Sequence, residues 1–520
     1  MKKLLLGDEA IAQGAIDAGL SGVYSYPGTP STEITEYIQK HAPQIRSRWC
    51  TNEKTAMEAA LGMSYAGKRA LVCMKHVGMN VCADAFINSA ITGVQGGLVV
   101  LAADDPSMHS SQNEQDSRFY AEFAMVPAFE PSNQQEAYEM VSEAFEWSER
   151  FRLPVLMRVV TRMAHSRAAV QTGAPRTQNA LSPASGKNWV LLPGIARRQY
   201  ASLIQKQEDI RAAVSGSTGI EWTGEGELGI VACGIGYNYV KEALQTSAAA
   251  VRGILKVNRY PVSVEAVKEL SQKCSRILVV EDGQPVVERT LPAMTAIKVE
   301  GRLTGALPRT GELSPDCVAL ALGAAAPATL PPARHLAARP PQLCPGCGHR
   351  DVYKALGEVA AGYPDARIFG DIGCYTLGAL PPFSALASCV DMGASITMAK
   401  GAADAGVFPA IAVIGDSTFT HSGMTGLLDA VNDHANITIV ISDNLTTAMT
   451  GGQDSAGTSK FEAICLGLGV EPEHLHVVVP LPANMAEITR IIREEIEYKG
   501  VSVIIPRREC MQTLKRHSKK

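Results

Sequence analysis

The sequence predicts an α/β fold built from three doubly wound domains. One observation is a strand–helix–strand pattern between Ile411 and Ile441, in which two apolar runs flank an amphipathic segment. Elsewhere, short β-branched runs alternate with helical patterns, as they do in parallel sheets with crossover helices. Finally, two stretches rich in Pro and Ala, Ser or Gly divide the 520 residues into three parts of ordinary domain size.

We interpret those two stretches, residues 171–188 and 324–342, as linkers. The predicted domains are therefore 1–172, 190–322 and 340–520. In the middle domain a strand at residues 228–233 runs into Gly234-Ile235-Gly236, but no acidic residue is placed to complete a dinucleotide fingerprint. We therefore expect a structural or assembly role for that domain.

The stretch from Ile411 to Gly452 carries the clearest pattern of a ligand site. Its first strand ends in Gly415-Asp416-Ser417 and its second ends in Asp443-Asn444. Because parallel neighbours end at the same edge of a sheet, Asp416 and Asn444 would both present an oxygen there. A carboxylate and an amide suit Mg²⁺, which takes further oxygens from substrate phosphates. The alternative, in which both residues only cap turns of a structural unit, is not excluded by the spacing.

Polar residues also follow strand ends in the first domain. Residues 4–20 predict a helix and residues 23–26 a strand, after which Thr29 is placed as a helix N-cap with Pro30 at the first helical position. The free amides of such a helix start can bind a carboxylate, although simple capping explains the pattern equally well. Glu53 lies in the first turn of the next helix, where its interaction with the helix dipole is a sufficient explanation.

Four cysteines stand out from the twelve in the chain. Cys344 and Cys347 form a CxxC loop, and Cys374 and Cys510 each follow a predicted strand of the same sheet. Four converging thiolates suit a [4Fe–4S] cluster. A CxxC metal loop with two unrelated cysteines is the open alternative. The others are interpreted as core residues: Cys50, Cys73, Cys82, Cys233, Cys274, Cys317, Cys389 and Cys465.

Composition excludes several classes of protein. Hydrophobic residues make up 46% and charged residues 19%, the net charge is −4, and the only basic run is at the last few residues. Nucleic acid is therefore not an expected partner. We find no signal-peptide core and no transmembrane stretch, so we expect a cytoplasmic protein with no membrane partner. Cysteines in that compartment are thiols or metal ligands rather than disulfides.

Seven segments together resemble the α subunit of the indolepyruvate ferredoxin oxidoreductase family, which belongs to the thiamine-diphosphate-dependent 2-oxoacid:ferredoxin oxidoreductases. They are YPGTPSTEI, NEKTAMEAA, MKHVG, SSQNEQDSR, CPGCGHR, GDSTFTHSG and TAMTGGQ. The resemblance runs from residue 4 to Cys510, essentially the whole chain. It implies a pyrimidine-binding thiamine diphosphate domain, a transketolase-C-like middle domain, and a diphosphate-binding and Mg²⁺-binding domain that carries the iron–sulfur cysteines.

The resemblance also implies roles for single residues. Glu53 matches the family's catalytic glutamate, which hydrogen-bonds the aminopyrimidine ring of the cofactor. Thr29 matches the loop that contacts the substrate carboxylate, and His76 and Gln112-Asn113 lie in the region that lines the pocket. Cofactor contacts are expected from Gly415, Asp416, Ser417, Asn444, Thr446, Asp371 and Gly373. Asp416, Asn444 and the backbone carbonyl of Thr446 would hold Mg²⁺, and Cys344, Cys347, Cys374 and Cys510 match the ligands of the proximal [4Fe–4S] cluster.

The activity implied is oxidative decarboxylation of a 2-oxoacid, with arylpyruvates such as indolepyruvate as the preferred class, to an acyl-coenzyme A. A smaller β subunit in an α2β2 assembly is expected, with coenzyme A as co-substrate and ferredoxin as electron acceptor. The family's α subunit usually continues into a ferredoxin-like domain with eight further cysteines, which this sequence lacks, so another low-potential acceptor is also considered. The alternatives are a non-oxidative thiamine-dependent decarboxylase or ligase and a catalytically silent cluster-binding subunit.

Overall fold

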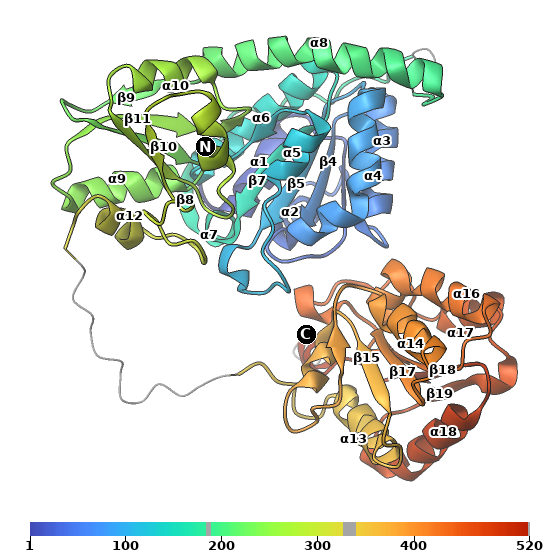
Figure 1. Ribbon diagram of the computed structural model, residues 1–520. Coiled ribbons are helices and arrows are strands. Elements are labelled where there is room, and N and C mark those ends of the chain that lie inside the picture. The colour runs from blue at the N-terminus through green and yellow to red at the C-terminus, as the bar shows by residue number, and fades with distance from the viewer. Residues whose placement is uncertain (184–188, 326–339, 518–520) are drawn as a thin grey trace. The chain divides into compact units, whose positions relative to one another are not determined.

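The computed structural model describes residues 1–183, 189–325 and 340–517, and these form two compact units, 1–331 and 332–520. Each unit is built on parallel β-sheets covered by helices, which confirms the predicted α/β class (Figure 1). The first unit contains two large sheets, so the first two predicted domains fall within one unit. The exact domain limits remain a prediction.

The first unit begins with a seven-stranded sheet in the order β12-β6-β7-β5-β4-β2-β3. All neighbours are parallel except β12, which pairs antiparallel with β6. The strands are β2 (Gly22–Ser25), β3 (Arg46–Trp49), β4 (Ala70–Lys75), β5 (Leu98–Asp104), β6 (Ala128–Phe129), β7 (Val155–Val160) and β12 (Arg259–Tyr260). Strand β5 is buried along its whole length, as expected for a parallel strand covered on both faces.

Seven helices surround this sheet, and a small antiparallel pair of strands lies beside it. The helices are α1 (Gly7–Asp17), α2 (Thr32–His41), α3 (Glu53–Tyr65), α4 (His76–Thr92), α5 (Arg118–Ala124), α6 (Gln134–Phe151) and α7 (Thr161–His165). The pair is β1 (Lys2–Leu6) with β8 (Arg167–Gln171). The predicted helix at residues 4–20 is therefore wrong at its start, because residues 2–6 pair with a strand more than 160 residues away.

The second sheet has the order β14-β13-β10-β11-β9, antiparallel only between β11 and β9. Its strands are β9 (Ile220–Trp222), β10 (Leu228–Cys233), β11 (Val251–Val257), β13 (Arg276–Val280) and β14 (Lys298–Glu300). The helices are α8 (Pro193–Ser217), α9 (Gly236–Thr246), α10 (Val264–Ser271), α11 (Val286–Thr290) and α12 (Pro315–Ala321). The predicted strand at residues 228–233 is confirmed.

Three features join the two sheets of the first unit. Helix α8 contacts α4 of the first sheet and α10 of the second, and Figure 1 shows it lying along both. Strand β12, from the middle region of the chain, adds to the first sheet. Two fully buried arginines also cross between the sheets: Arg158 donates to Asp104 at 2.6 Å and to the Asp282 carbonyl at 2.9 Å, and Arg118 donates to Glu281 at 2.8 Å.

The linker prediction at residues 171–188 is only partly correct. Residues 172–183 have no regular structure, but they pack on the first domain: Arg176 donates its backbone N–H to the Asp17 carbonyl at 2.7 Å, and Ser182 donates to the Ala66 carbonyl at 3.0 Å. The second predicted linker lies mostly outside the described residues.

The second unit is a six-stranded, all-parallel sheet in the order β16-β15-β17-β18-β20-β19. Its strands are β15 (Arg367–Gly370), β16 (Ser388–Cys389), β17 (Ala410–Gly415), β18 (Ile437–Ser442), β19 (Leu475–Val478) and β20 (Val501–Pro506). Its helices are α13 (Gly348–Ala360), α14 (Ala394–Asp404), α15 (Asp416–Thr418), α16 (Met424–Asn432), α17 (Phe461–Gly467), α18 (Met485–Glu497) and α19 (Met511–His517). The predicted βαβ unit with adjacent parallel strands is confirmed as β17 and β18 with their connecting helix.

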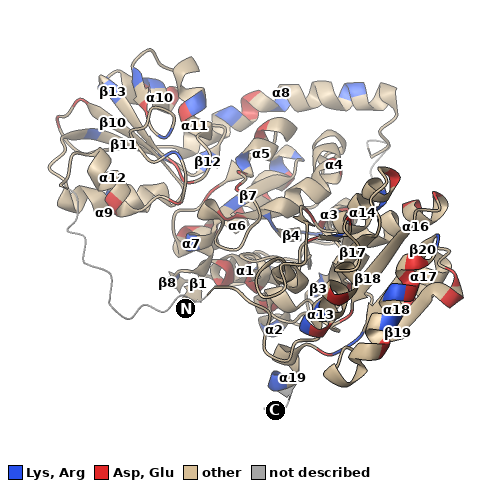
Figure 2. Ribbon diagram, turned by 60° about the horizontal axis from the view of Figure 1, so that its bottom comes forward, with Lys and Arg blue, Asp and Glu red and all other residues tan. Residues whose placement is uncertain are grey.

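Charges of both signs are interspersed on the helices, for example on α8 and α18 (Figure 2). Helix α18 buries Ile488, Ile491, Ile492 and Ile496, as an amphipathic helix does, together with one charged residue, Glu495. Among the described residues, no helix combines the length and apolar character that a membrane span requires.

Candidate functional site

In the first unit, the predicted site residues follow four neighbouring strands at their carboxyl ends. Thr29 follows β2, Glu53 follows β3, His76 follows β4 and Asn113 follows β5. These strands are adjacent and parallel, so their carboxyl ends form one edge, where open α/β sheets bind ligands. The structure therefore gathers these residues, more than 80 positions apart in the chain, at one edge of one sheet.

Glu53 is held at the first position of α3 with its side chain buried. The preceding residue, Asn52, is the N-cap, and its side chain accepts the Thr55 N–H at 2.9 Å. Glu53 is 5% exposed and lies against Gly78 of α4, where a Cβ would come within 2.6 Å of the Glu53 Cγ and 2.7 Å of Oε1. Only glycine leaves room for this carboxylate. Such close packing sets its position more firmly than a dipole interaction alone would.

The structure places the Thr29 loop differently from the prediction. Helix α2 starts at Thr32, its N-cap is Ser31, and the Thr29–Pro30 peptide bond is cis, so Thr29 is not the cap. The hydroxyl of Ser31 donates to the Gly28 carbonyl at 2.8 Å, and that of Thr32 accepts the Gly28 N–H at 3.1 Å. These bonds fold residues 28–32 into a closed turn that precedes the helix. Thr29 is half-buried at its tip.

His76 and Asn113 meet directly. The Nε2 of His76 lies 3.2 Å from Oδ1 of Asn113, and the imidazole is fully buried. The neighbouring Lys75 donates its ammonium to the Ser110 carbonyl at 2.6 Å, and burial lowers the pKa of this lysine. The polar loop after β5 is thus fastened to the end of β4.

In the second unit, Asp416 and Asn444 lie at the carboxyl ends of β17 and β18, as predicted. One backbone amide joins them: the Thr446 N–H lies 3.1 Å from Oδ2 of Asp416 and 3.2 Å from Oδ1 of Asn444. The other oxygen of Asp416 accepts the Ser417 N–H at 2.7 Å. The Ser417 hydroxyl in turn accepts from the Thr447 hydroxyl at 3.0 Å. The two predicted ligands are therefore positioned together by the loop between residues 444 and 447.

The electrostatics of Asp416 indicate a need for positive charge. It is 3% exposed, and burial, followed by the nearby negative charge of Asp443, raises its pKa to about 7. Arg507 donates to Asp443 at 2.6 Å, so this arginine pairs with Asp443 rather than with Asp416. A bound divalent cation would keep Asp416 ionised, because an adjacent positive charge favours the carboxylate. The oxygen-only donor set fits Mg²⁺.

Asp371 is held by several hydrogen bonds within the loops of the second unit. Asp371 is fully buried and accepts from the Ser395 hydroxyl at 2.7 Å, from the backbone N–H groups of Ser395 and Gly393 at 3.2 Å, and from the Tyr375 hydroxyl. Burial nevertheless raises its pKa to about 6. Through these hydrogen bonds Asp371 connects the loop after β15 to the start of α14. A direct contact with a cofactor stays a prediction.

The ring of Tyr375 explains why residues 373 and 415 are glycines. A Cβ on Gly373 would come within 2.2 Å of the Tyr375 ring, and one on Gly415 within 2.6 Å. The ring is 2% exposed and packs between the loop after β15 and the loop after β17. Sequence reasoning missed this residue, because a tyrosine four positions after an aspartate has no distinctive pattern.

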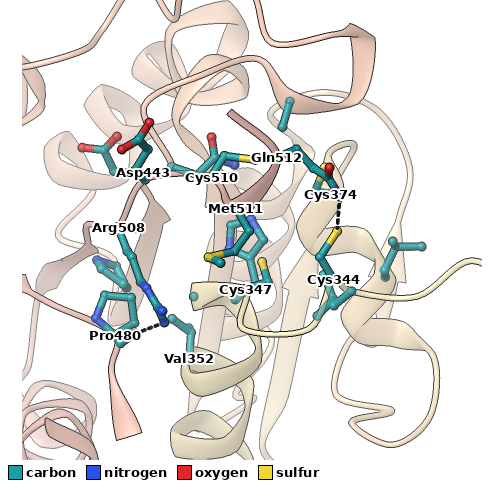
Figure 3. A pocket seen from close by; sticks show the side chains of 18 of the residues that line it. Cys344, Cys347, Val352, Cys374, Asp443, Pro480, Arg508, Cys510, Met511 and Gln512 are labelled. Atoms are coloured by element: carbon teal, nitrogen blue, oxygen red, sulfur yellow. Dashed lines mark hydrogen bonds between the residues drawn. The ribbon is translucent and has the colours of Figure 1, made fainter. Parts of the chain in front are cut away.

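The four predicted cluster cysteines line one cavity of about 90 Å³ at the same edge of the sheet (Figure 3). Cys344 and Cys347 come from the loop before α13, Cys374 follows β15, and Cys510 follows β20. The same cavity is lined by Asn444. The structure thus brings together all four cysteines and one of the two strand-end oxygen ligands within the second unit.

The thiols influence one another electrostatically. Burial, then the charges of Cys510, Cys347 and Cys344, raise the pKa of Cys374 to about 12. Deprotonating thiols this close together requires a compensating positive charge, which an iron–sulfur centre or another metal supplies. Gln512 also reaches the site, with its Nε2 3.3 Å from the Cys344 sulfur (Figure 3). His349 lines the same cavity. Neither role was predicted, since single polar residues near a CxxC carry no pattern.

The remaining cysteines are not all in the core. Cys73, Cys82, Cys233 and Cys465 are buried, but Cys50, Cys274 and Cys317 are only partly buried, and Cys389 is exposed. The core interpretation is therefore wrong for Cys389, which ends the edge strand β16. This residue provides a control for the cluster cysteines.

Comparisons with known proteins agree with this arrangement. The family model for the thiamine diphosphate-binding domain of pyruvate flavodoxin/ferredoxin oxidoreductases matches residues 13–187, and that for the C-terminal TPP-binding domain of thiamine pyrophosphate enzymes matches residues 371–505. The indolepyruvate oxidoreductase subunit IorA of Archaeoglobus fulgidus is 37% identical over 98% of this chain and 86% of its own length. The chain belongs to the IorA family.

Other members of the IorA family show the same relation. The IorA subunit of Thermococcus kodakarensis is 36% identical, again over 98% of this chain and 85% of its own length. Membership places the chain among the thiamine-diphosphate-dependent 2-oxoacid:ferredoxin oxidoreductases and confirms the resemblance seen in the motifs.

A solved structure shares the fold. It is the 2-oxoglutarate:ferredoxin oxidoreductase from Magnetococcus marinus, determined with 2-oxoglutarate, coenzyme A and succinyl-CoA bound. The TM-score is 0.52 at 17% identity, and the match covers 62% of this chain and 65% of that chain. At this identity the match establishes similarity of fold.

Proposed function

We propose that this chain is the α subunit of an enzyme that oxidatively decarboxylates a 2-oxoacid to the acyl-coenzyme A. The substrate class is the arylpyruvates, with indolepyruvate as the representative, because the IorA relatives carry that name. Electrons pass through a [4Fe–4S] cluster to ferredoxin or another low-potential acceptor.

A single observation carries the proposal. Cys344, Cys347, Cys374 and Cys510 line the same cavity as Asn444, at the edge where Asp416 also lies. A non-oxidative thiamine enzyme has a use for the oxygen ligands but none for four converging thiols. Because the two donor sets adjoin, an electron acceptor beside the thiamine cofactor is the arrangement they support.

The residues fit the cofactors by their chemistry. Asp416, Asn444 and the Thr446 carbonyl would hold Mg²⁺ against the diphosphate, and Glu53 of the first unit would hydrogen-bond the pyrimidine ring. When bound, thiamine diphosphate would supply the electron-accepting thiazolium ring that decarboxylation needs. Glu53 lies buried against Gly78, a setting in which it can hold a proton at one position. Thr29, His76 and Asn113 lie at the same edge as Glu53 and would line the substrate pocket.

A smaller β subunit is part of the proposal. The relatives are named as subunits, which supports a partner chain. The motif resemblance implies that the partner chain would bind coenzyme A in an α2β2 assembly. The reaction with coenzyme A would then require both chains, whereas cofactor and cluster binding would require this chain alone.

Anaerobic purification of the chain with its partner subunit tests the cluster. We expect about four iron and four sulfide per chain, one thiamine diphosphate, and viologen reduction that depends on an arylpyruvate. Cys374→Ser should lose most of the iron and the viologen reduction. The matched control Cys389→Ser, at an exposed cysteine after the neighbouring strand, should retain both.

Three results would contradict the proposal. Zinc without labile sulfide would show that the cysteines hold a structural metal. Thiamine diphosphate with substrate decarboxylation but no cluster would indicate a non-oxidative enzyme. A cluster without thiamine diphosphate would indicate a catalytically silent subunit.

A further inference from the structure

Two carboxylates and one imidazole lie close together at helix ends in the first unit. The proposed function uses none of these three residues. Asp8 lies in the first turn of α1, Glu33 in the first turn of α2, and His165 ends α7. One donor atom from each side chain lies within 4.8 Å of the other two. The three residues come from parts of the chain up to 157 positions apart, so folding alone brings them together.

Helix capping does not explain Asp8. The carboxylate of Glu9 accepts the free Leu6 N–H at 2.8 Å and so serves the start of α1. Asp8 is 0% exposed, and neither of its carboxyl oxygens has a hydrogen-bond partner among the described residues. A buried, unpaired carboxylate costs free energy unless a partner is supplied.

One carboxyl oxygen of Glu33 also lacks a hydrogen-bond partner among the described residues. Its Oε1 lies 3.6 Å from Nε2 of His165, while its Oε2 is buried and has no partner among the described residues. Three unpartnered carboxyl oxygens thus lie in one cluster, and among the described residues His165 is the basic side chain that pairs with it. Burial and the negative charges of Glu33 and Glu9 raise the pKa of Asp8 well above its usual range.

We propose that Asp8, Glu33 and His165 bind a divalent transition-metal ion, with Zn²⁺ as the best match. Zn²⁺ accepts imidazole nitrogen together with carboxylate oxygen, and three protein ligands leave a fourth position for water. Mg²⁺ prefers oxygen donors, so the imidazole favours zinc. The ion supplies the positive charge that Asp8 lacks.

The geometry requires only a small adjustment. Zinc bonds of about 2.1 Å place tetrahedral donors about 3.4 Å apart, against a present spread of up to 4.8 Å. The side chains of Glu33 and His165 are 37% and 34% exposed, so both can rotate toward the fixed Asp8. Their exposure also gives the ion a path from solvent.

Bound zinc would connect three helix ends. Residues 28–32, which hold Thr29, end where α2 begins, one residue before Glu33. The ion would therefore stiffen the base of that loop. This role is structural and does not depend on the identity of the substrate.

The test compares zinc content in the full-length chain after chelation and dialysis against Zn²⁺. Because the cysteine cavity can also take zinc, the difference between variants is the measured quantity. Asp8→Asn should bind one zinc per chain fewer than wild type. The control Glu36→Gln, with the same loss of charge at an exposed position of α2, should match wild type.

Anomalous diffraction at the zinc edge locates the ion. A peak among the three side chains in wild type, absent in Asp8→Asn, is the expected result. Equal zinc content in both proteins, or a peak only at the cysteines, would overturn the proposal and leave Asp8 as a buried neutral acid. If Asp8→Asn fails to fold, Glu33→Gln and His165→Gln at half-exposed positions give the same comparison. Because zinc content is independent of turnover, neither outcome affects the proposed reaction.

Discussion

Two buried carboxylates of the candidate site have unlike surroundings. Asp416 accepts hydrogen bonds from two backbone amides, of Ser417 and Thr446, and its pKa is raised to about 7 by burial. Glu53 instead packs its side chain against the bare backbone of Gly78. The surroundings of Asp416 suit a ligand for a cation. Those of Glu53 suit a carboxylate that must keep a fixed position against the pyrimidine ring of the cofactor.

Replacing Glu53 with Gln tests this assignment. The amide keeps the size of the side chain but cannot exchange the proton, so substrate-dependent viologen reduction should fall by about 100- to 10,000-fold. Thiamine diphosphate content and the thermal midpoint should stay close to wild type. Glu58→Gln, at an exposed position of the same helix, is the control and should retain activity. Full activity of Glu53→Gln would remove Glu53 from the mechanism.

Asp282 gives a pH-dependent prediction for stability. Burial raises its pKa to about 6, above the ordinary value of 3.8, so the folded chain favours the protonated form. The stability contributed by this group is complete below about pH 4 and is lost as the pH rises through about 6. Two pKa units correspond to about 3 kcal/mol.

Asp282→Asn should therefore be more stable than wild type above pH 6 and equal to it near pH 4. Urea unfolding of the first unit at pH 4, 6 and 8 measures the difference. Asp209→Asn, at an exposed position of α8, should show no such trend. A constant difference between wild type and Asp282→Asn at all three pH values would refute the burial argument.

At the scale of elements, helices α3 and α4 pack closely where the Glu53 side chain of α3 contacts Gly78 of α4. Gly78→Ala would push the new methyl group into Glu53, whereas Gly62 of α3 has open space around its would-be Cβ. We expect Gly78→Ala to reduce viologen reduction by about 100-fold, since a displacement near 1 Å has that effect.

Gly62→Ala is the paired comparison. It should raise the free energy of unfolding by about 0.5–1 kcal/mol, because alanine favours the helix, and leave activity unchanged. Thermal melts and turnover of both variants decide the matter. Unchanged activity in Gly78→Ala would mean that the contact with Glu53 does not position the carboxylate.

Elements with strong local patterns were predictable from the sequence. Strands β10, β17 and β18 follow from β-branched runs, and the family follows from the motifs. What failed depends on distant partners. Residues 2–6 form a strand because β8 pairs with them, and β12 was missed because two residues carry no signal without β6.

The candidate site was predictable only where its residues lie in local sequence patterns. Asp416, Asn444, Cys374 and Cys510 follow strands, so sheet topology gathers them, whereas Cys344 and Cys347 were recognised by their CxxC spacing. Tyr375 and the internal hydrogen bonds of Asp371 depend on packing between loops, which spacing does not encode. The cluster of Asp8, Glu33 and His165 was missed because its members share no motif.

At the scale of the whole molecule, each unit has its own hydrophobic cores. One core cluster spans residues from Leu5 to Leu322, and two others lie between Leu343 and Ile505. The first joins both sheets of the first unit, which explains why two predicted domains form one compact unit. Separate cores allow each unit to hold its fold independently.

Fragments 1–325 and 340–520 should therefore each fold when expressed alone. Circular dichroism and cooperative thermal melts measure folding. After anaerobic reconstitution, the second fragment should bind iron and the first should not, because all four cluster cysteines lie beyond residue 340. Failure of the second fragment to melt cooperatively would show that its sheet and helices need the first unit to fold.

The ring of Tyr375 has a consequence for electron movement in the proposed enzyme. It fills the space between Gly373, next to Cys374, and Gly415, next to Asp416, so those two loops share one rigid spacer. One-electron transfer is fast when donor and acceptor surroundings rearrange little as charge moves. A packed aromatic ring limits that rearrangement, so the residue that fixes two glycines would also keep the reorganisation energy low.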